Sequence, residues 1–404
     1  AATQAAQAER AAAEAAQAER VSAAGPPVGT ATGALVVDTG TGEAKLLLVL
    51  DGEAIELQEL GIVKMQALEV SKALSTGSAE GAAQFEEYVS PLRKGLAAFL
   101  SSSEAGSVHL LAGLVGVTAW FRRLKGEEQA NAEVFLRRLV EALNVPLSAS
   151  SRTCRMRLHI VDGKDEALYE LKAVEYAVTE SGLEPPLATM AGGSGSIQIS
   201  GLDNFFSFDA PLKEGEGLVA KAEGADRPAA VEEWSRLVLQ SYSAAAAQSG
   251  GFTDQVGELA QEGEVHLVCI SAFYYLALAA GIVQKGDDAA YCTGSEVQAK
   301  LGALCGQPTA KAKDVANAAR MSALLDALFG ASMGHVRCLF ARDWVLAGKP
   351  FRTTWTAGWW LTEREALTGG DAAADANGLA LLGPEVQAAQ EAAEAGRAAT
   401  QAAQ

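Results

Sequence analysis

Cysteine is scarce in this sequence, and so are aromatic residues and positive charge. Five cysteines are scattered over 404 residues without a Cys-x-x-Cys pair, which argues against a disulfide framework and against a zinc site with the usual Cys/His spacing. We therefore expect free, buried thiols. Aromatic residues make up only 6% of the chain, so the core is expected to consist mainly of aliphatic side chains and alanine.

The charge balance is acidic, with 32 Lys and Arg against 50 Asp and Glu and a net charge of −18. A surface of this kind does not neutralise the phosphates of nucleic acids or of anionic lipid, so we expect no nucleic-acid partner. Hydrophobic residues make up 49% of the chain, which is too much for a wholly disordered protein. The length fits two domains of common size with room for tails.

One apolar run is long enough to require a membrane test. Residues 265–283, VHLVCISAFYYLALAAGIV, reach the minimum length of a membrane-spanning helix and contain no Asp, Glu, Lys or Arg. One histidine, one serine and two tyrosines interrupt the run, and Lys and Arg are sparse at its flanks. We therefore expect a buried strand followed by a helix and no transmembrane span.

Signals for a cellular compartment are few. The sequence has no Asn-x-Ser/Thr sequon, and it begins without Met and without an apolar leader. These features are not typical of a disulfide-rich or N-glycosylated secreted protein, and they fit a mature chain after import into an organelle. The compartment itself stays open.

Both ends of the sequence are rich in alanine. Residues 1–29 and 384–404 repeat Ala, Gln, Glu and Arg, and the segment AAQAER occurs twice near the start. Such segments favour a helix by propensity but lack a large apolar stripe. We expect helical or disordered tails, which either fray or bind protein partners.

Strands and helices alternate between the tails. The pattern predicts a strand to Asp38, a glycine-rich turn, a second strand through Leu50, and a third strand after an Asp-Gly turn. A helix from about 85 to 100, a strand at 108–117 and an amphipathic helix at 165–178 follow. The second half is more helical. This mixture predicts α/β layers.

Two glycine-rich turns are candidates for phosphate binding. The first is Asp38-Thr39-Gly40-Thr41-Gly42, where the amides of residues 40–42 can hold a terminal phosphate and Asp38 can orient a hydrated divalent cation. The second lies at 190–198, MAGGSGSIQ. Two such turns in one α/β chain can embrace a phosphate chain from two sides of a cleft. The alternative is that both turns use glycine for backbone freedom alone.

The order of the motifs resembles the apyrase family of nucleoside di- and triphosphatases, a branch of the actin, heat-shock ATPase and sugar kinase superfamily. The family's phosphate loop, Asp-x-Gly-Ser-Thr-Gly-Thr-Arg, is similar to VDTGTGEAK at 37–45 in shortened form. Its second block, Gly-Ala-Thr-Ala-Gly followed by Arg, resembles GVTAWFR at 116–122. Its third block, Gly-x-Glu-Glu-Gly-x-Tyr, resembles GKDEALY at 163–169.

The resemblance continues to about residue 365. The family's fourth block, Asp-Leu-Gly-Gly-Ala-Ser-Thr-Gln, is similar to the turn at 190–198, and two later aromatic blocks are similar to SAFYYLA at 271–277 and TTWTAGWWL at 353–361. It implies two actin-like, ribonuclease H-like α/β lobes around a cleft. The implied division is lobe I at 30–185, lobe II at 186–350 and a return to lobe I at 351–383.

The resemblance also implies roles for individual residues. Glu166 would be the general base that activates water, and Asp38 would orient Mg²⁺ or Ca²⁺. Ser196 and Gln198 would contact phosphate and the attacking water. The phosphate chain would be bound by Gly40, Thr41, Gly42, Lys45, Thr118, Arg122, Gly192, Gly193 and Ser194. Two structural alternatives stay open: acidic residues such as Glu166 are favoured at any helix start, and Arg122 can serve a structural role.

The sequence departs from the family at four positions of this site. Met190 stands where the fourth block has its Asp, Lys45 replaces an Arg, Ala167 follows the expected base in place of Gly, and Trp120 replaces a Gly where its indole can fill the nucleotide site. A further cluster, Trp355, Trp359 and Trp360, can stack a base, but its spacing favours core packing.

These departures favour a catalytically degenerate apyrase-like protein, kept as a binding or scaffolding subunit. The alternative is an active, divalent-metal-dependent nucleoside di- or triphosphate hydrolase that uses Glu166 as its base. Phosphate release from nucleotides separates the two. The sequence does not indicate nucleotide preference, partner identity or oligomeric state.

Removal of residues 1–24 and 384–404 is expected to leave the midpoint of thermal unfolding within a few degrees of that of the full chain. The reason is that their small side chains bury little apolar area. Calorimetry or circular dichroism on both chains measures this difference. A fall of about 8 °C or more would show that the tails pack on the lobes.

Overall fold

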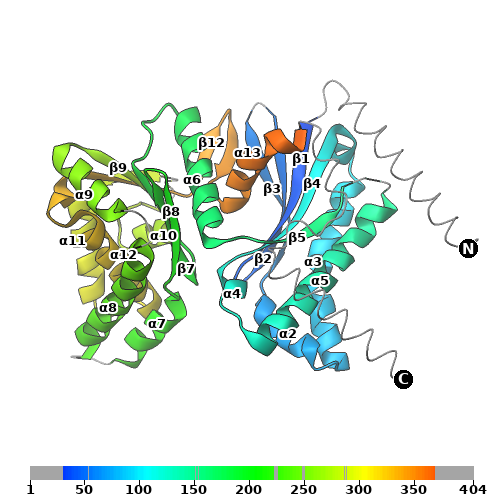
Figure 1. Cartoon of the computed structure of the whole chain (residues 1–404), viewed down its shortest axis with the longest axis horizontal. Helices are drawn as coiled ribbons and strands as arrows, with labels where there is room; N and C mark the ends of the chain where they lie inside the picture. The colour runs from blue at the N-terminus through cyan, green and yellow to red at the C-terminus, as the bar shows by residue number, and fades with distance from the viewer. Residues whose placement is uncertain are drawn as a thin grey trace, which may run out of the picture.

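Two mixed β-sheets form the framework of the chain. The computed structural model describes residues 31–368, except positions 53, 151, 153, 223–225, 248–250, 286 and 288. The predicted tails at 1–29 and 384–404 lie outside the described residues. The strand orders of the two large sheets are β3-β2-β1-β4-β5 and β10-β11-β9-β6-β7-β8, and Figure 1 shows them in separate halves of the molecule.

The first sheet begins with the predicted hairpin. The antiparallel strands β1 (Ala31–Thr39), β2 (Ala44–Asp51) and β3 (Ile55–Val63) are followed by β4 (Val108–Val117) and β5 (Met156–Ile160), which run parallel to β1. Alternate residues of β1 face opposite sides, because side chains along a strand alternate. Leu35 belongs to the apolar cluster under the outer helices, whereas Val36 belongs to a cluster shared with lobe II.

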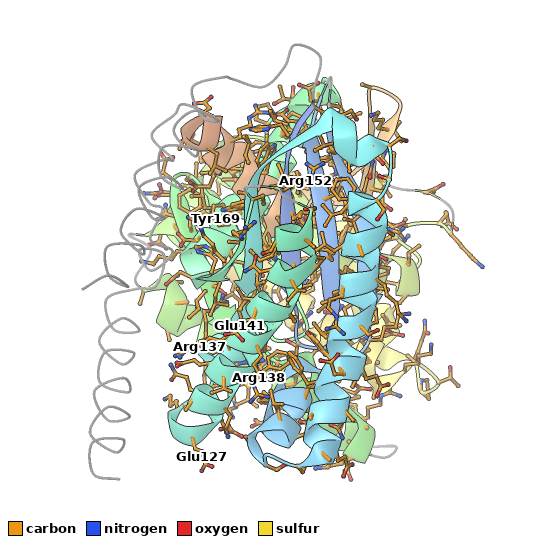
Figure 2. The ribbon with its side chains drawn as sticks, turned by 90° about the vertical axis from the view of Figure 1, so that its right-hand side faces the viewer. Glu127, Arg137, Arg138, Glu141, Arg152 and Tyr169 are labelled. Carbon is orange, nitrogen blue, oxygen red and sulfur yellow. The ribbon has the colours of Figure 1, made fainter. Side chains whose placement is uncertain are left out.

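Helices α2 (Ala67–Ser75), α3 (Ala79–Leu100) and α5 (Gly126–Ala149) cover the outer face of this sheet. In Figure 2 these helices face the viewer, and charged residues are labelled along α5. Glu127, Arg138 and Glu141 are on the solvent side of α5, whereas Phe135 and Leu139 are buried in the core below it. The 3-10 turn η1 (Glu104–Ser107) precedes β4, and the single helical turn α4 (Ala119–Arg122) follows it.

Lobe II repeats this plan. Strands β6 (Ala188–Gly192), β7 (Ser196–Gly201) and β8 (Asn204–Asp209) form an antiparallel meander, and β9 (Val265–Ser271) and β11 (Val336–Ala341) extend the sheet in parallel, with β10 (Ala289–Thr293) antiparallel at the edge. One face is covered by α7 (Leu212–Lys221), α8 (Arg227–Ala246), α9 (Phe252–Glu262), α11 (Gly294–Gly306) and α12 (Ala312–Phe329). The 3-10 turn η3 (Gly330–His335) leads into β11.

The apolar run at 265–283 folds as predicted. It forms β9 in the centre of the sheet and the short helix α10 (Ala272–Ala279), both largely buried. Within the described part of the chain, no helix is both long and apolar enough to cross a membrane.

A layer of two helices joins the two lobes. Helices α6 (Gly163–Glu180) and α13 (Trp355–Thr368) lie between the sheets in Figure 1 and pack extensively on each other. One apolar cluster contains Val36 of β1, Ile270 of β9 and Trp360 of α13, so both sheets share this layer. Trp355, Trp359 and Trp360 are buried here, which confirms the prediction of core packing.

The end of the described chain contacts lobe I. The hairpin of β12 (Asp343–Leu346) and β13 (Lys349–Arg352) lies beside β3, and Lys349 pairs with Glu56 at 2.6 Å. From α13, Arg364 pairs with Asp51 at 3.2 Å. The residues that follow the second sheet therefore pack against the first, and α6 and α13 hold the lobes together.

The α6–α13 contact depends on a glycine. A Cβ added to Gly358 would overlap the backbone carbonyl of Tyr169 on α6, whereas a Cβ at Gly302 of α11 would meet no atom within 4 Å. Gly358→Ala is therefore expected to lower the free energy of unfolding by about 1–3 kcal/mol, because the two helices must separate. Gly302→Ala, the matched control, is expected to raise it by about 0.5–1 kcal/mol. Urea unfolding measures both, and equal effects would contradict the close helix contact.

Candidate functional site

The first glycine-rich turn connects β1 to β2 and is closed by its own backbone. The Gly40 N–H donates to the Glu43 carbonyl at 2.9 Å, and the Thr39 hydroxyl donates to the Gly116 carbonyl on β4 at 2.7 Å. These bonds fix the turn to the end of the neighbouring parallel strand. The Gly40 amide is therefore used inside the turn, which differs from the expectation that it binds phosphate.

Two amides of this turn are available to a ligand. Among the described residues, none accepts a hydrogen bond from the N–H of Thr41 or Gly42, and a Cβ added at Gly42 would meet no atom within 4 Å. Successive free amides beside open space can hold an anion. Lys45 instead pairs with Glu43 of the same turn at 2.6 Å.

Asp38 lies at the end of β1, opposite Lys45 on β2. Burial raises the pKa of Asp38, while the Trp355 indole and Lys45 act in the opposite direction. Trp355 also packs on Gly116, where a Cβ would overlap its ring. Helix α13 therefore contributes a wall beside the carboxylate that the sequence assigned to the metal.

The second glycine-rich turn connects β6 to β7 in lobe II. The Gly193 N–H donates to the Ser196 carbonyl at 2.9 Å, so this turn closes in the same way as the first and uses the Gly193 amide internally. Gly192 ends β6 against an aromatic ring, since a Cβ there would lie 3.0 Å from Phe273 Cε2.

The outer part of this turn is tied to the start of α7. The Ser194 carbonyl accepts from the Leu212 N–H at 2.9 Å, and the Gly195 carbonyl accepts from the Ala210 N–H at 3.2 Å. No residue of the described chain accepts a hydrogen bond from the N–H of Ser194 or Gly195. Each turn thus has fixed carbonyls and two unpaired amides.

A buried arginine supports the second turn from inside lobe II. Arg320 on α12 is fully buried and donates to the carbonyls of Gly193 and Ala210 at 3.0 and 3.1 Å, and to Asn317 Oδ1 at 2.6 Å. Its guanidinium lies 5.4 Å from the centroid of Phe273. No carboxylate in the described part of the chain pairs with it, and burial lowers the pKa of Arg320 to about 9. A cation without a counter-ion therefore lies behind the turn.

The two turns meet at Arg123. A Cβ built on Gly195 would lie 2.7 Å from Arg123 Nη2 and 3.5 Å from Thr41 Oγ1. The first turn, the second turn and a guanidinium from the end of α4 therefore converge at one point between the lobes. The sequence predicted that the turns face each other, but it selected Arg122 as the cation.

Arg122 instead donates hydrogen bonds to other residues of the protein. Its Nη1 donates to the Val161 carbonyl at 2.6 Å, and its Nη2 donates to Glu166 Oε2 at 2.8 Å. Glu166 is itself buried in the first turn of α6. Burial raises the pKa of Glu166, Arg122 lowers it, the charge of Asp38 raises it, and the Gln198 amide lowers it. The predicted base therefore has one oxygen bound by Arg122.

Gln198 and Ser196 lie on the lobe II side of Glu166. Gln198 Nε2 donates to Ser196 Oγ at 2.7 Å and to Ser207 Oγ at 3.3 Å, and both Gln198 and Ser196 are buried. This polar group lies on β7 and β8, against the first turns of α6. The structure thus brings Glu166, Gln198 and Ser196 together, as the sequence predicted for a base and its partners.

Glu170 adds a carboxylate that the sequence did not single out. It lies one helical turn after Glu166, is buried, and its Oε2 has no hydrogen-bond partner in the described part of the chain. Burial and the charges of Glu166 and Asp38 raise the pKa of Glu170 well above its usual value, and Arg122 opposes this only in part. Only its spacing of four residues from Glu166 could have indicated it.

Met190, which the sequence comparison set opposite the Asp of the fourth block, does not face the site, whereas its neighbour Ala191 does. Met190 is buried in the core of lobe II with Ile199, its partner across the strands, whereas Ala191 faces the layer between the lobes and pairs with Gln198. Cross-strand partners share a face, so Ala191 points toward the Gln198 and Glu166 side. With Ser196 and Gln198 matched to the Ser and Gln of that block, its Asp also aligns with Ala191.

Trp120 does not enter the space between the turns. It is 3% exposed, belongs to the core of lobe I, and packs edge-on against Phe121 at 5.9 Å. Its Nε1 donates to the Thr39 carbonyl at 2.7 Å, so it supports the first turn from below. The expectation of a blocked nucleotide site is therefore wrong. Thr118, also buried, precedes α4 at the end of β4.

The residues present do not make a resident metal site. Within the described chain, no three His, Cys, Asp or Glu side chains are grouped as ligands. Asp38 is a single carboxylate with a raised pKa, and Glu166 is bound to Arg122. Mg²⁺ and Ca²⁺ are bound through several oxygen ligands. A divalent ion would therefore have to arrive with a ligand that supplies most of its oxygens.

A cavity of about 530 Å³ opens beside Arg123. Its lining comes from Arg122 and Arg123 of lobe I, from the start of α6, and from residues 203–209 at and before β8 of lobe II. Its charges are mixed, with Arg122, Arg123 and Lys164 against Asp162, Asp203 and Asp209. This cavity adjoins the point where the two turns meet.

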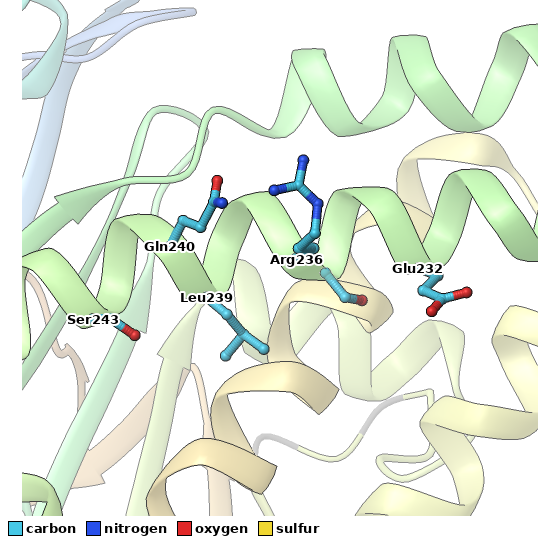
Figure 3. A pocket seen from close by; sticks show the side chains of 6 residues that line it. Glu232, Arg236, Leu239, Gln240 and Ser243 are labelled. Carbon is cyan, nitrogen blue, oxygen red and sulfur yellow. The ribbon is translucent and has the colours of Figure 1, made fainter.

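Another pocket, of about 530 Å³, lies on the exposed face of α8. Figure 3 shows Glu232, Arg236 and Gln240 along this helix, with Leu239 on the opposite side of the helix from Arg236 and Gln240. Arg236 is paired with Glu233 at 2.6 Å. None of the sequence-predicted site residues lines this pocket, so it is separate from the turns.

Two further residues of the site were not predicted from the sequence. Arg123 follows the predicted Arg122, and the Arg-Arg pair gave no indication of which side chain faces the turns. Arg320 lies in an alanine-rich helix almost 130 residues after Gly193, with no motif around it. Both roles arise from tertiary packing.

Comparison with known proteins gives a fold and no family. No protein-family profile matches the sequence, and no curated protein matches it. Among solved structures, a PPX-GPPA enzyme of Aquifex aeolicus is similar over 82% of this chain and 100% of its own, with 13% identity and a TM-score of 0.50. A nucleoside triphosphate hydrolase of Neospora caninum is similar over 93% of this chain and 99% of its own, with 11% identity and a TM-score of 0.51.

These similarities confirm the predicted architecture. The chain has an α/β fold of two actin-like lobes, the fold shared by these phosphatase structures. At this level of identity the likeness extends to the fold alone, and the narrower resemblance to apyrases stays a prediction.

Glu170→Gln is expected to raise the free energy of unfolding above that of the wild-type chain at pH 8. At pH 4.5 this difference between the two chains is expected to be much smaller. A carboxyl whose folded-state pKa is raised binds a proton more tightly in the folded chain, so its contribution to stability is lost as pH rises from its usual value of 4.5 toward the raised one. The slope approaches about 1.4 kcal/mol per pH unit. Glutamine cannot ionise and removes this loss. Urea unfolding at several pH values measures it, and parallel curves for the two chains would contradict a buried, protonated Glu170.

Proposed function

We propose that this chain binds the phosphate chain of nucleoside di- or triphosphates and is an apyrase-like protein with a degenerate catalytic site, kept as a binding or scaffolding subunit. The observation that carries the proposal is the position of Ala191. It occupies the position on β6 that faces Gln198 and the Glu166 side, where the resemblance requires a second carboxylate.

Binding is supported by the two turns. Four backbone amides in them have no acceptor within the described chain, at residues 41, 42, 194 and 195. The buried Arg320 adds positive charge behind the second turn. Free amides with a nearby fixed cation form a preorganised site for phosphate oxygens.

The environments of the two carboxylates support the proposal that catalysis is weak. Glu166 has one oxygen bound to Arg122 at 2.8 Å, and Asp38 lies beside Trp355 with a raised pKa. Mg²⁺ in phosphoryl-transfer sites is held by one or two carboxylates together with phosphate oxygens. With alanine at 191, the second carboxylate is missing.

An active hydrolase is the second candidate, because one observation favours it. Asp38 and Glu166 both remain and lie close enough to raise the pKa of Glu166. A general base works best when its pKa is near the working pH. In this reading Glu166 would take the proton of the attacking water.

Two measurements distinguish the two candidates. We expect the full chain to bind ADP and ATP with an affinity that changes less than about threefold when Mg²⁺ is replaced by EDTA. We also expect phosphate release no faster than that of Glu166→Gln. Calorimetry gives the affinity and a phosphate assay gives the rate. Metal-dependent release that Glu166→Gln abolishes would establish the active hydrolase instead.

Ala191→Asp is expected to make ATP binding dependent on Mg²⁺ by about tenfold, because it supplies a second carboxylate on the face toward Glu166. Met190→Asp is the matched control. It places the same charge in the apolar core of lobe II and is expected to lower stability by several kcal/mol without restoring the metal dependence. Titration in Mg²⁺ and in EDTA, with thermal unfolding of each variant, measures both. Gain of metal dependence only in Met190→Asp would contradict the assignment of position 191.

A further inference from the structure

Arg122 and Arg123 leave α4 in different directions and have different partners. Arg122 is bound to the Val161 carbonyl and to Glu166. Arg123 reaches across to lobe II, where its Nη2 lies beside Gly195 of the second turn. Two neighbouring arginines thus divide into one that holds lobe I to α6 and one that reaches the space between the turns.

The guanidinium of Arg123 has unused hydrogen-bond donors. Its Nε donates to the Ala119 carbonyl at 3.3 Å, a long bond, and no acceptor in the described part of the chain is bound to its Nη groups. The same part of the chain contains no carboxylate in ion-pair contact with it. A guanidinium offers five N–H donors in a planar fork that matches two phosphate oxygens.

The surroundings of Arg123 are also rich in donors. Thr41 brings a hydroxyl to the same point, and the amides at 41, 42, 194 and 195 are unpaired among the described residues. A ligand for these groups must carry many acceptor oxygens and negative charge. A chain of phosphates has both properties, whereas a sugar has oxygens but no negative charge, and a neutral base has few oxygens and no negative charge.

We propose that Arg123 is the residue that binds the phosphate chain, by forming a bridge from the end of α4 to the second turn. This inference rests on the proposed function and makes it narrower: recognition is directed to the phosphates and not to the base. It follows that inorganic tripolyphosphate binds about as tightly as ATP, while AMP binds much more weakly.

The overall charge of the chain makes a local cation necessary. The net charge is −18, and three buried carboxyl groups lie near one another at the site, Asp38 of β1 and Glu166 and Glu170 of α6. A phosphate chain would be repelled by these groups unless fixed positive charge faced it. Lys45 and Arg122 are already paired with Glu43 and Glu166, and Lys164 lines the cavity at the start of α6, so Arg123 and the buried Arg320 are the cations next to the second turn.

The test compares Arg123→Gln with Arg138→Gln in the full chain. Arg138 lies on the exposed outer face of α5, labelled in Figure 2, so its replacement removes the same charge from the same lobe but far from the turns. Calorimetry with ATP, tripolyphosphate and AMP gives the affinities. We expect Arg123→Gln to weaken binding of ATP and tripolyphosphate about 10- to 100-fold, and Arg138→Gln to change it less than about twofold.

Arg123→Lys provides a second variant. It keeps the charge but loses the planar fork, so its affinity is expected to lie between those of the wild-type chain and Arg123→Gln. Thermal unfolding of each chain without ligand shows whether a loss of binding follows from a loss of structure. If Arg123→Gln does not fold, the lysine variant decides the matter, because it keeps the charge and loses only the planar fork.

Several outcomes would overturn this assignment. Equal affinity of Arg123→Gln and the wild-type chain would show that Arg123 does not bind phosphate, and leaves the proposed function standing. Higher affinity of the variant would show that the guanidinium closes the space between the turns against ligands. Strong binding of AMP would place recognition on the nucleoside. If the wild-type chain binds neither ATP nor tripolyphosphate, both the assignment and the proposed function fail.

Discussion

At the start of α6, the carboxylate of Glu166 is bound by Arg122 of lobe I and faces Gln198 of lobe II. Through this ion pair the first turn of α6, a helix that packs on β6, β7 and β8 of lobe II, is bound to α4 of lobe I. Removing one partner of a buried pair leaves an uncompensated charge at a cost of about 3–5 kcal/mol. Glu166 is therefore a structural residue whether or not it acts on water.

Strand alternation decides which residues of a glycine-rich block face the site. Met190 and Ala191 are neighbours in sequence, yet one lies in the core of lobe II and the other in the layer between the lobes. A motif comparison that shifts by one residue therefore moves a functional position from the site into the core. The pairing of Ala191 with the buried Gln198, which is bound to Ser196, places residue 191 and not residue 190 on the face toward the site.

The elements of the fold were predictable because their signals are local. The hairpin of β1 and β2, the strand β4 and the amphipathic α6 follow from apolar periodicity and glycine turns. Trp120 was misjudged because nothing local shows which way a side chain points after a strand end, and its indole bonds to the Thr39 carbonyl from the core. Arg123 and Arg320 reach the turns from other elements, so their roles follow only from tertiary packing.

The electrostatics of the site divide it into two sides. One side carries Asp38 at the end of β1 with Glu166 and Glu170 of α6, each with a pKa raised by burial, and the other carries the unpaired amides of the turns with Arg123 and Arg320. A bound phosphate chain would lie between them and bring further negative charge toward the carboxylates. Its charge would raise their pKa values still more, so a bound phosphate chain would favour the protonated carboxyl groups.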